Sequence, residues 1–513
     1  MLGQMLGRGL GARAVAPALL AALVLLACPL ARAAPASIAV RVVGSGQGGA
    51  VIPQSFLGLS VETPALRSPS IAAPAPALWR LMRQLGPGVL RLSGVSVDRT
   101  QWLGSSERPA PWRIASIAPP DLRNLAALMG ETGWRLLLGL NLGHPASSAL
   151  VEEARAAKAI LGGWLAGFEI GNEPDLYTRP PSMPFRALLG SGALRPRGWG
   201  LGEYESEISS LRGALSAAGV PVALYGPDTA RPDWLESFAE QQRPGLAALA
   251  QHYYPLDRCE GGRVAKHPPS IAALLSARVS RREVQRIAAL VRLAHRDGLP
   301  LRIDEANSVS CAGQQHTSDT FAAALWAVDF SLIAAQRGAI GVNFHGGLGS
   351  CYLGGTIASP WYSPLCTLPR GQLHARPEYY ALLLLRSLEG CAFVRASYHT
   401  QRNVDVYALR APDGSLRVVI DDKETAGGSA GAMPPPAPVW VALHAARSFT
   451  TASVVRLSAP SAAARAGVSY GDATVAADGG FTARTGGALA GGPGSFVVQV
   501  KPASVAVVTL ASG

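Results

Sequence analysis

The feature that most constrains the fold is an eight-fold alternation of short apolar runs and amphipathic stretches between residues 56 and 344. Each run ends in polar or glycine residues, as expected of strands followed by loops. Strands that alternate with helices pair in parallel through right-handed crossovers, and eight of them close a (β/α)8 TIM barrel. The predicted strands cover residues 56–61, 89–92, 135–140, 168–170, 222–225, 249–253, 301–304 and 340–344. A doubly wound open sheet is the alternative, but it gathers its polar residues at one switch point.

Outside this region the chain has a different character. The pattern predicts an α/β protein in which the barrel covers residues 53–386. From residue 387 to 513, short strands separated by Gly-, Ala- and Pro-rich turns predict an all-β sandwich domain. A strand at 37–43 precedes the barrel and has no partner within it. We therefore expect the N-terminal segment 35–52 to pair with the C-terminal sheet.

Residues 1–34 have the pattern of a secretory signal peptide. Arg8 and Arg13 precede an apolar run, and Ala31-Arg32-Ala33 fits a small-residue cleavage site. This predicts export to the periplasm or the extracellular space. Lipoprotein anchoring at Cys28 is the less favoured alternative, because Pro29 follows the cysteine. The remaining apolar stretches are too short for stable membrane insertion.

Charge and cysteine content narrow the possible partners. The formal net charge is +12, and the leader contributes three arginines and no acid, so +9 remains after its removal. Such a surface favours polyanions, although the preference of a GC-rich genome for arginine over lysine explains much of the excess equally well. Basic residues are not clustered with aromatic ones, which argues against nucleic-acid binding. Export permits disulfides among Cys259, Cys311, Cys351, Cys366 and Cys391, with one thiol left over. Cys351 and Cys366, which flank a Gly/Pro-rich loop, are the first expected pair.

Two glutamates stand at strand ends. Glu173 follows the fourth predicted strand in Gly171-Asn172-Glu173-Pro174, and Glu305 ends the seventh. Proline at 174 biases Glu173 towards an extended backbone. Because the carboxyl ends of barrel strands converge on one face, residues 132 positions apart in the sequence can meet there. Two facing carboxylates are what glycosidic bond cleavage requires. The alternative is that both are surface or ion-paired residues.

Three segments resemble glycoside hydrolase family 79, the β-glucuronidases and heparanases. They are residues 171–174, residues 304–308 and the Ser-Asp-Thr-Phe-Ala-Ala stretch at 318–323. The first two strands, with Glu62 and with Ser93-Gly94, are also similar to the family. The resemblance covers residues 50–390. It implies that Glu173 is the general acid/base and Glu305 the nucleophile of a retaining mechanism.

The resemblance also implies substrate-binding residues. Asn172 would hold the sugar 2-hydroxyl, and Glu62 and Asp98 would accept hydrogen bonds from other ring hydroxyls. A structural role for these two buried acids stays open. Tyr254 would hydrogen-bond the nucleophile, and its side chain shares one face of the chain with His252. We expect His252 to be a buried histidine with satisfied hydrogen bonds rather than an acid/base.

Recognition of a uronic acid needs donors for its carboxylate. The family uses backbone N–H groups of the loop after the nucleophile together with a tyrosine. Here these would be the loop 309–313, including Gly313, and Tyr352. Cys311-Ala312 departs from the double glycine of heparanases, which leaves the detailed contacts open.

The sequence therefore predicts an exo-acting retaining β-glucuronidase that acts on carbohydrates bearing β-linked glucuronic acid, including polyanionic ones. An endo-acting, heparanase-like enzyme and a non-catalytic carbohydrate-binding barrel are the alternatives. The net charge favours the endo-acting form, whereas the glycine-rich segment 343–347 resembles exo-acting members. We expect no cofactor and no metal, because the spacing of His252, His316 and His345 matches no ligand motif.

Overall fold

The computed structural model describes residues 37–43, 49–73, 75–104, 108–182, 185–221, 223–259, 268–425, 436–484 and 486–512. The predicted signal peptide and Cys28 lie outside these residues, as does Val222. Ala36–Gly513 forms one compact unit. Of the helices in the described residues, none combines the length and apolar character needed to cross a membrane.

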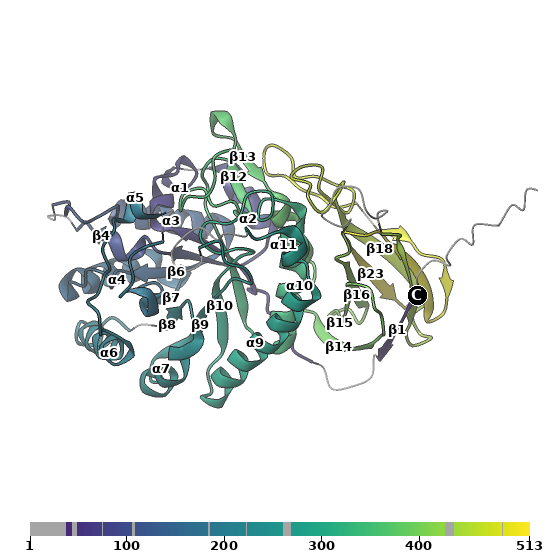
Figure 1. The fold of residues 1–513 in the computed structure, drawn as a ribbon, viewed down its shortest axis with the longest axis horizontal. Helices are drawn as coiled ribbons and strands as arrows, with labels where there is room; N and C mark the ends of the chain where they lie inside the picture. The colour runs from purple at the N-terminus through teal and green to yellow at the C-terminus, as the bar shows by residue number, and fades with distance from the viewer. Residues whose placement is uncertain are drawn as a thin grey trace, which may run out of the picture. The chain divides into compact units, whose positions relative to one another are not determined.

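Eight parallel strands form a closed barrel, as predicted (Figure 1). Around the barrel the order is β10-β11-β2-β3-β6-β7-β8-β9, so β7 is the fourth barrel strand along the chain and β10 the seventh. Each of the eight predicted runs overlaps a barrel strand, the run 222–225 only at residues 224 and 225. Their bounds are β2 Leu57–Glu62, β3 Val89–Ser93, β6 Arg135–Leu140, β7 Leu165–Ile170, β8 Leu224–Thr229, β9 Leu246–Tyr253, β10 Leu301–Ala306 and β11 Gly341–Gly346.

Helices connect the strands. They include α2 Pro76–Gln84, α3 Pro119–Thr132, α4 Ser147–Leu161, α6 Leu201–Ala217, α7 Leu235–Gln242, α9 Ala277–Arg296, α10 Phe321–Arg337 and α11 Pro377–Arg386. Local signals set their ends: α3 begins with proline in its first turn and stops at Gly133, whose left-handed backbone suits glycine. The pattern did not predict two small two-stranded sheets, β4 Thr100–Trp102 with β5 Ala115–Ile117, and β12 Leu365–Thr367 with β13 Leu373–Ala375.

An eleven-stranded sheet follows the barrel in the chain. Its longer strands are β14 Ala392–Ser397, β15 Val404–Arg410, β16 Leu416–Asp422, β17 Val439–His444, β18 Thr451–Ser458, β22 Ser495–Val500 and β23 Ser504–Ala511. Strand β1, Ser37–Val43, lies between β14 and β17, as expected for the N-terminal segment. Apolar side chains from both halves of the sheet share one core, which makes this a sandwich-like arrangement.

Helix α10 joins the two sheet systems. It is buried nearly all round, because barrel strands pack on one side and the C-terminal strands on the other (Figure 1). Its Asp329 accepts a hydrogen bond from the Tyr407 hydroxyl at 2.5 Å and pairs with the buried Lys423. Tyr407 and Lys423, both from the C-terminal sheet region, therefore hold the helix in place.

Disulfides stabilise the loops at one end of the barrel. Cys351 pairs with Cys366, as predicted, and Cys259 pairs with Cys311. The remaining described cysteine, Cys391, is a buried free thiol. The Cys259–Cys311 bridge links the loop after β9 to the loop after β10, which follows Glu305.

Candidate active site

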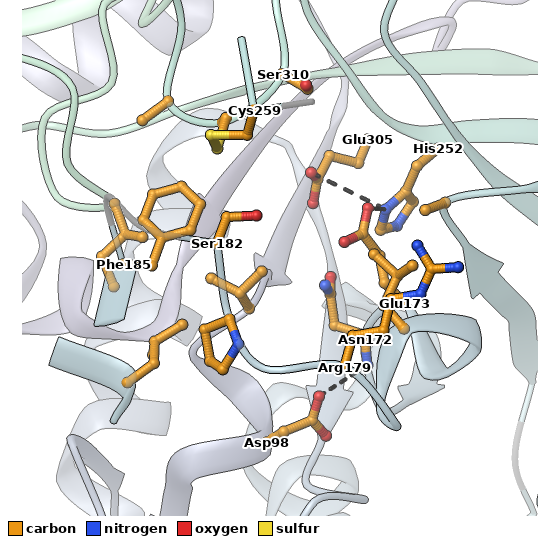
Figure 2. A pocket seen from close by; sticks show the side chains of 18 of the residues that line it. Asp98, Asn172, Glu173, Arg179, Ser182, Phe185, His252, Cys259, Glu305 and Ser310 are labelled. Atoms are coloured by element: carbon orange, nitrogen blue, oxygen red, sulfur yellow. Dashed lines mark hydrogen bonds and ion pairs between the residues drawn. A yellow bond between two sulfur atoms is a disulfide. The ribbon is translucent and has the colours of Figure 1, made fainter. Parts of the chain in front are cut away.

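Glu173 and Glu305 meet at the carboxyl ends of β7 and β10 (Figure 2). One carboxylate oxygen of each lies within 4.8 Å of the other. They face a cavity of about 640 Å³. The prediction that two glutamates far apart in the sequence face each other is thus confirmed.

The backbone of Glu173 differs from the prediction. Pro174 was expected to leave it extended, yet its φ and ψ are 50° and 53°, a left-handed conformation. Its N–H donates to the Asp228 carbonyl at 2.8 Å, and its carbonyl accepts from Leu176 N–H at the start of a 3-10 helix. The following proline disfavours only the right-handed helical region, so this sharp turn stays open to the chain. A strained residue of this kind is often found at functional sites.

Cationic and donor groups surround Glu305. Its Oε2 accepts from Arg91 Nη1 at 2.7 Å, and its Oε1 accepts from the Tyr254 hydroxyl at 2.8 Å. His345 Nδ1 lies 3.7 Å from Oε2. Burial by itself raises the pKa of Glu305, but His345, His252, Arg91 and the Tyr254 hydrogen bond outweigh it and hold the pKa well below its usual range. Glu305 is therefore ionised.

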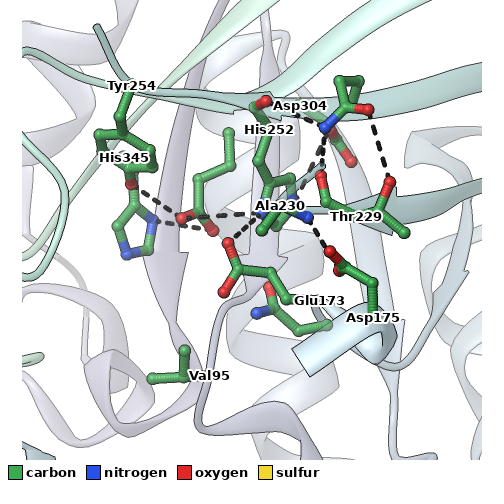
Figure 3. Close-up of polar contacts among 12 residues, drawn as sticks. Val95, Glu173, Asp175, Thr229, Ala230, His252, Tyr254, Asp304 and His345 are labelled. Carbon is green, nitrogen blue, oxygen red and sulfur yellow. Dashed lines mark hydrogen bonds and ion pairs between the residues drawn. The ribbon is translucent and has the colours of Figure 1, made fainter. Parts of the chain in front are cut away.

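The pKa of Glu173 is shifted in the opposite direction, upwards. Burial raises its pKa, and the negative charge of Glu305 adds to this, while the hydrogen bond from His252 opposes it. His252 Nδ1 lies 3.1 Å from Glu173 Oε1 (Figure 3). Two carboxylates in one site thus have pKa values that are pushed apart, which is the arrangement expected of an acid and a nucleophile.

The tautomer of His252 follows from its neighbours. Burial lowers the pKa of His252, but the carboxylates of Glu305, Glu173 and Asp304 raise it further, to about 9. A protonated ring, however, would set Nε2–H against the Arg91 Nη2–H donor at 3.2 Å. In both protonation states Nδ1–H donates to Glu173, and in the neutral ring Nε2 accepts from Arg91.

Three buried carboxyl groups lie inside the barrel behind this pair: Glu169, Asp228 and Asp304. Burial raises the pKa of Asp228 well above its usual value and that of Glu169 to about 8. Asp304 is also buried, yet its interactions with Asp228, His252, Arg91 and Glu169 lower its pKa. The raised pKa values of Asp228 and Glu169 favour their protonated forms beside Asp304, and Arg91 Nε donates to Glu169 Oε2 at 2.7 Å.

The structure brings Asn172, Glu62 and Asp98 to the same cavity. Asn172 Oδ1 accepts from Arg91 Nη2 at 3.0 Å, which orients its amide and leaves Nδ2 without a partner in the described residues. Glu62 accepts from the backbone of Val95 and Ser96. Asp98 also accepts backbone N–H groups, so both acids hold loops in place as well as line the cavity.

The tyrosine expected beside the loop after the nucleophile is a different residue. Tyr352 is 63% exposed and does not line the cavity. Its turn faces outward, held by Ser350 and by the Cys351–Cys366 bridge. Tyr362 lines the cavity instead, with its ring centroid 5.9 Å from that of Tyr254.

Within the loop 309–313, Cys311, Ala312 and Gly313 all have positive φ. Cys311 and Ala312 line the cavity, whereas Gly313 lies behind them and its carbonyl accepts from Arg258. The backbone N–H groups of Cys311 and Ala312 have no acceptor in the described part of the chain. They are therefore available to a ligand.

Several residues of the site were not predicted: Arg91, Glu169, Asp228, Asp304, His345 and Tyr362. A signal for four of them exists. Parallel barrel strands are buried on both faces and are normally apolar, so an ionisable residue in the middle of β3, β7, β8 or β10 indicates a polar interior.

Two sets of side chains could offer atoms to a metal ion: Glu173, His252 and Glu305, or Asp228, His252 and Asp304. Both sets use His252, whose two ring nitrogens already face Glu173 and Arg91. A metal ion would have to displace one of these contacts beside a cationic guanidinium. The donors fit two-carboxylate chemistry better than a metal centre.

Comparison with known proteins supports this architecture. The solved 4-O-α-L-rhamnosyl-β-D-glucuronidase of Fusarium oxysporum has a TM-score of 0.70 at 18% identity, over 92% of this chain and 100% of that one. The family 51 arabinofuranosidase of Xanthomonas axonopodis pv. citri has a TM-score of 0.60 at 14% identity, over 93% and 99%. The chain has the fold of these glycoside hydrolases, a TIM barrel with an attached β domain.

Sequence comparison points to β-glucuronidases, as the motifs predicted. The chain is 27% identical over 248 residues to the β-glucuronidase of Aspergillus niger, and 28% identical over 242 residues to that of Neurospora crassa. These alignments cover 43% and 42% of this chain. They span less than half of each relative, 42% and 39%. No family model matches the chain.

The buried position of Arg91 yields a stability prediction. Arg91→Met leaves Glu169, Asp304 and Glu305 without their shared cation, and breaking a buried ion pair costs about 3–5 kcal/mol. We expect that loss in the free energy of unfolding, measured with urea. Arg83→Met, at an exposed pair with Glu131, is the control and should change nothing measurable. Equal, small effects of both substitutions would contradict the role given to Arg91.

Proposed function

We propose that this protein is a retaining glycoside hydrolase that removes β-linked glucuronic acid. The observation that carries the proposal is the pair Glu173 and Glu305, with oxygens within 4.8 Å and pKa values shifted in opposite directions. Retaining enzymes hold their carboxyl groups about 5–5.5 Å apart, whereas inverting enzymes leave about 6.5–9.5 Å for a water. The short separation supports retention.

The two steps follow from the protonation states. Ionised Glu305 attacks the anomeric carbon while Glu173 gives its proton to the leaving oxygen, so the glycosidic bond breaks and a glycosyl ester forms. His252 Nδ1–H binds Oε1 of Glu173. This leaves Oε2 to carry the proton. In the second step, ionised Glu173 takes a proton from water, which attacks the anomeric carbon and releases Glu305.

Sugar recognition uses groups that are free to bind. The Asn172 Nδ2 donor suits the 2-hydroxyl, and Glu62 and Asp98 suit other ring hydroxyls. For the uronate carboxylate we propose the N–H groups of Cys311 and Ala312 with the Tyr362 hydroxyl, in place of Gly313 and Tyr352. The two β-glucuronidase relatives support a uronic acid at this position.

We further propose that the protein is exported. The two disulfides, Cys259–Cys311 and Cys351–Cys366, support an oxidising compartment, because such bonds are rare in the reducing cytosol.

An endo-acting enzyme on an acidic polysaccharide is the second candidate. The cavity extends from the catalytic pair along the segment 176–194, where Arg179 and Arg186 line it. A cleft with basic walls favours a polyanionic chain. A non-catalytic barrel has less support, since both glutamates retain the environment that an acid and a nucleophile need.

Substitution of the two glutamates tests the function. Glu305→Gln should abolish hydrolysis of both an aryl β-glucuronide and a natural glycoside. Glu173→Gln should slow the natural glycoside about 10²–10⁴-fold, and much less the first step with a good aryl leaving group, which needs little acid help. The exposed Glu131→Gln serves as the control. Full activity of either catalytic variant on a natural glycoside would refute the assignment.

The pH dependence tests the environment of the pair. Activity needs ionised Glu305 and protonated Glu173, so kcat/KM rises with pH through the low pKa of Glu305 and falls through the raised pKa of Glu173. Tyr254→Phe removes a hydrogen bond to the ionised form of Glu305. The pKa of Glu305 and the acid limb should move up by about 1–2 pH units, and the basic limb should stay in place. A shift confined to the basic limb would contradict this assignment.

Product size separates the two modes of action. Exo action on an acidic polysaccharide with terminal glucuronate should release single sugars while the polymer keeps its length. We expect this result in a time course followed by size-exclusion chromatography. A rapid fall in polymer length would instead establish the endo-acting enzyme.

A further inference from the structure

Arg99 differs from the other buried arginines in the described residues. It lies in the 3-10 helix Val97–Arg99 after β3, lines the cavity, and is only 9% exposed. Arg91, Arg302 and Arg376 are also buried, and each donates to specific acceptors. No hydrogen bond or ion pair joins the Arg99 guanidinium to any described residue. A buried cation without a partner is costly, so a ligand that supplies an anion would stabilise it.

The neighbouring carboxylate of Asp98 fills this role only in part: burial lowers the pKa of Arg99, and the charge of Asp98 does not fully offset this. Asp98 Oδ1 accepts from the N–H groups of Leu142 and Gly143, and Oδ2 accepts from Asn172 N–H. The Tyr177 hydroxyl is a further partner of Asp98. Burial raises the pKa of Asp98 to about 6 despite these bonds. Its oxygens are thus turned towards the protein rather than towards Arg99.

Two further basic residues, Arg195 and His144, lie near Arg99 and Asp98. Arg195 donates to the carbonyls of Leu142 and Gly143, beside Asp98, and His144 Nδ1 lies 3.0 Å from the Asp98 carbonyl. Burial lowers the pKa of His144, and the charges of Arg99 and Arg195 lower it further. Glu207 pairs with Arg195, and neither residue lines the cavity. Arg99 thus remains a cation at this end of the cavity without a hydrogen-bond acceptor in the described residues.

This end is not where the uronate carboxylate is proposed to bind. Asp98 and Ser310 stand at opposite ends of the cavity, with Glu305 and Glu173 between them (Figure 2). Ser310 belongs to the loop 309–313, whose N–H groups are proposed for the uronate. Arg99, adjacent to Asp98, lies at the end proposed for the ring hydroxyls.

We propose that Arg99 binds a second anionic group of the substrate, a carboxylate or a sulfate, on the side of the glucuronosyl residue that faces Asp98. The proposal rests on the proposed function. The group could belong to the next acidic sugar of a chain or to a sulfate on a hydroxyl of the glucuronosyl ring itself. In both cases Arg99 offers paired N–H donors that match the planar or tetrahedral oxyanion. The substrate is then an acidic glycan with at least two negative charges near the cleavage site.

The test compares Arg99→Gln with the wild-type protein on three substrates. These are an aryl β-glucuronide, its ring-sulfated derivative, and an oligosaccharide extended beyond the glucuronate by a second uronic acid. On the first, kcat/KM should stay within about twofold. On the sulfated or the extended substrate it should fall about 10–100-fold, mainly through KM, since a charge-assisted hydrogen bond is lost. The substrate that shows the loss identifies the source of the anion.

Two further variants provide controls. Arg99→Lys keeps the charge and should recover part of the loss. Arg83→Gln removes an exposed arginine that does not line the cavity and should not distinguish the three substrates. Equal losses on all three substrates with Arg99→Gln, or no loss on either doubly charged one, would overturn the proposal.

Binding without turnover separates this proposal from the proposed function. In the Glu305→Gln background, calorimetry with the extended oligosaccharide should show about 10–100-fold weaker binding when Arg99→Gln is added. Absence of hydrolysis by the wild-type protein would refute the proposed function alone. Equal affinity of the two variants for the extended oligosaccharide would refute the role of Arg99 alone.

Discussion

One buried guanidinium organises the polar interior of the barrel. Arg91 is fully buried in β3 and contacts Glu169, Glu305, Asn172 and His252. A buried charge is tolerated only when its donors are satisfied, and each of these contacts supplies an acceptor. Because an arginine can only donate, every partner must present a lone pair to it. One side chain thereby fixes the orientation of groups from three different strands or strand ends, those of β7, β9 and β10.

The opposite pKa shifts of Glu173 and Glu305 follow from this arrangement. Arg91 binds Glu305 directly and helps to keep it ionised. Through His252, it also determines which nitrogen faces Glu173. The two glutamates are therefore differentiated by contacts from outside the pair, although they are the same residue type and have oxygens within 4.8 Å of each other. Glu169 and Asp304, inside the barrel, lie beside Arg91 and offset part of its positive charge.

The features that the sequence predicted well are those encoded by local patterns. All eight barrel strands could be placed from apolar runs that end in polar residues, and the pairing of β1 with the C-terminal sheet from its lack of a partner in the barrel. The Cys351–Cys366 pair followed from its short loop. The backbone of Glu173 and the choice of Tyr352 were predicted incorrectly. The first depends on the hydrogen bond from Glu173 to Asp228, and the second on how a disulfide-bonded loop turns.

The sequence by itself determined the barrel and the two strand ends that carry Glu173 and Glu305, because periodicity and strand order are local properties of the chain. Only the tertiary structure decided which glutamate is ionised, which tyrosine lines the cavity, and that Arg99 is left without a partner. Those outcomes depend on desolvation and on contacts between distant segments, such as the one from Arg91 to Glu305 across 214 positions. No local pattern contains that information, since burial and the direction of a side chain arise only once the barrel has closed.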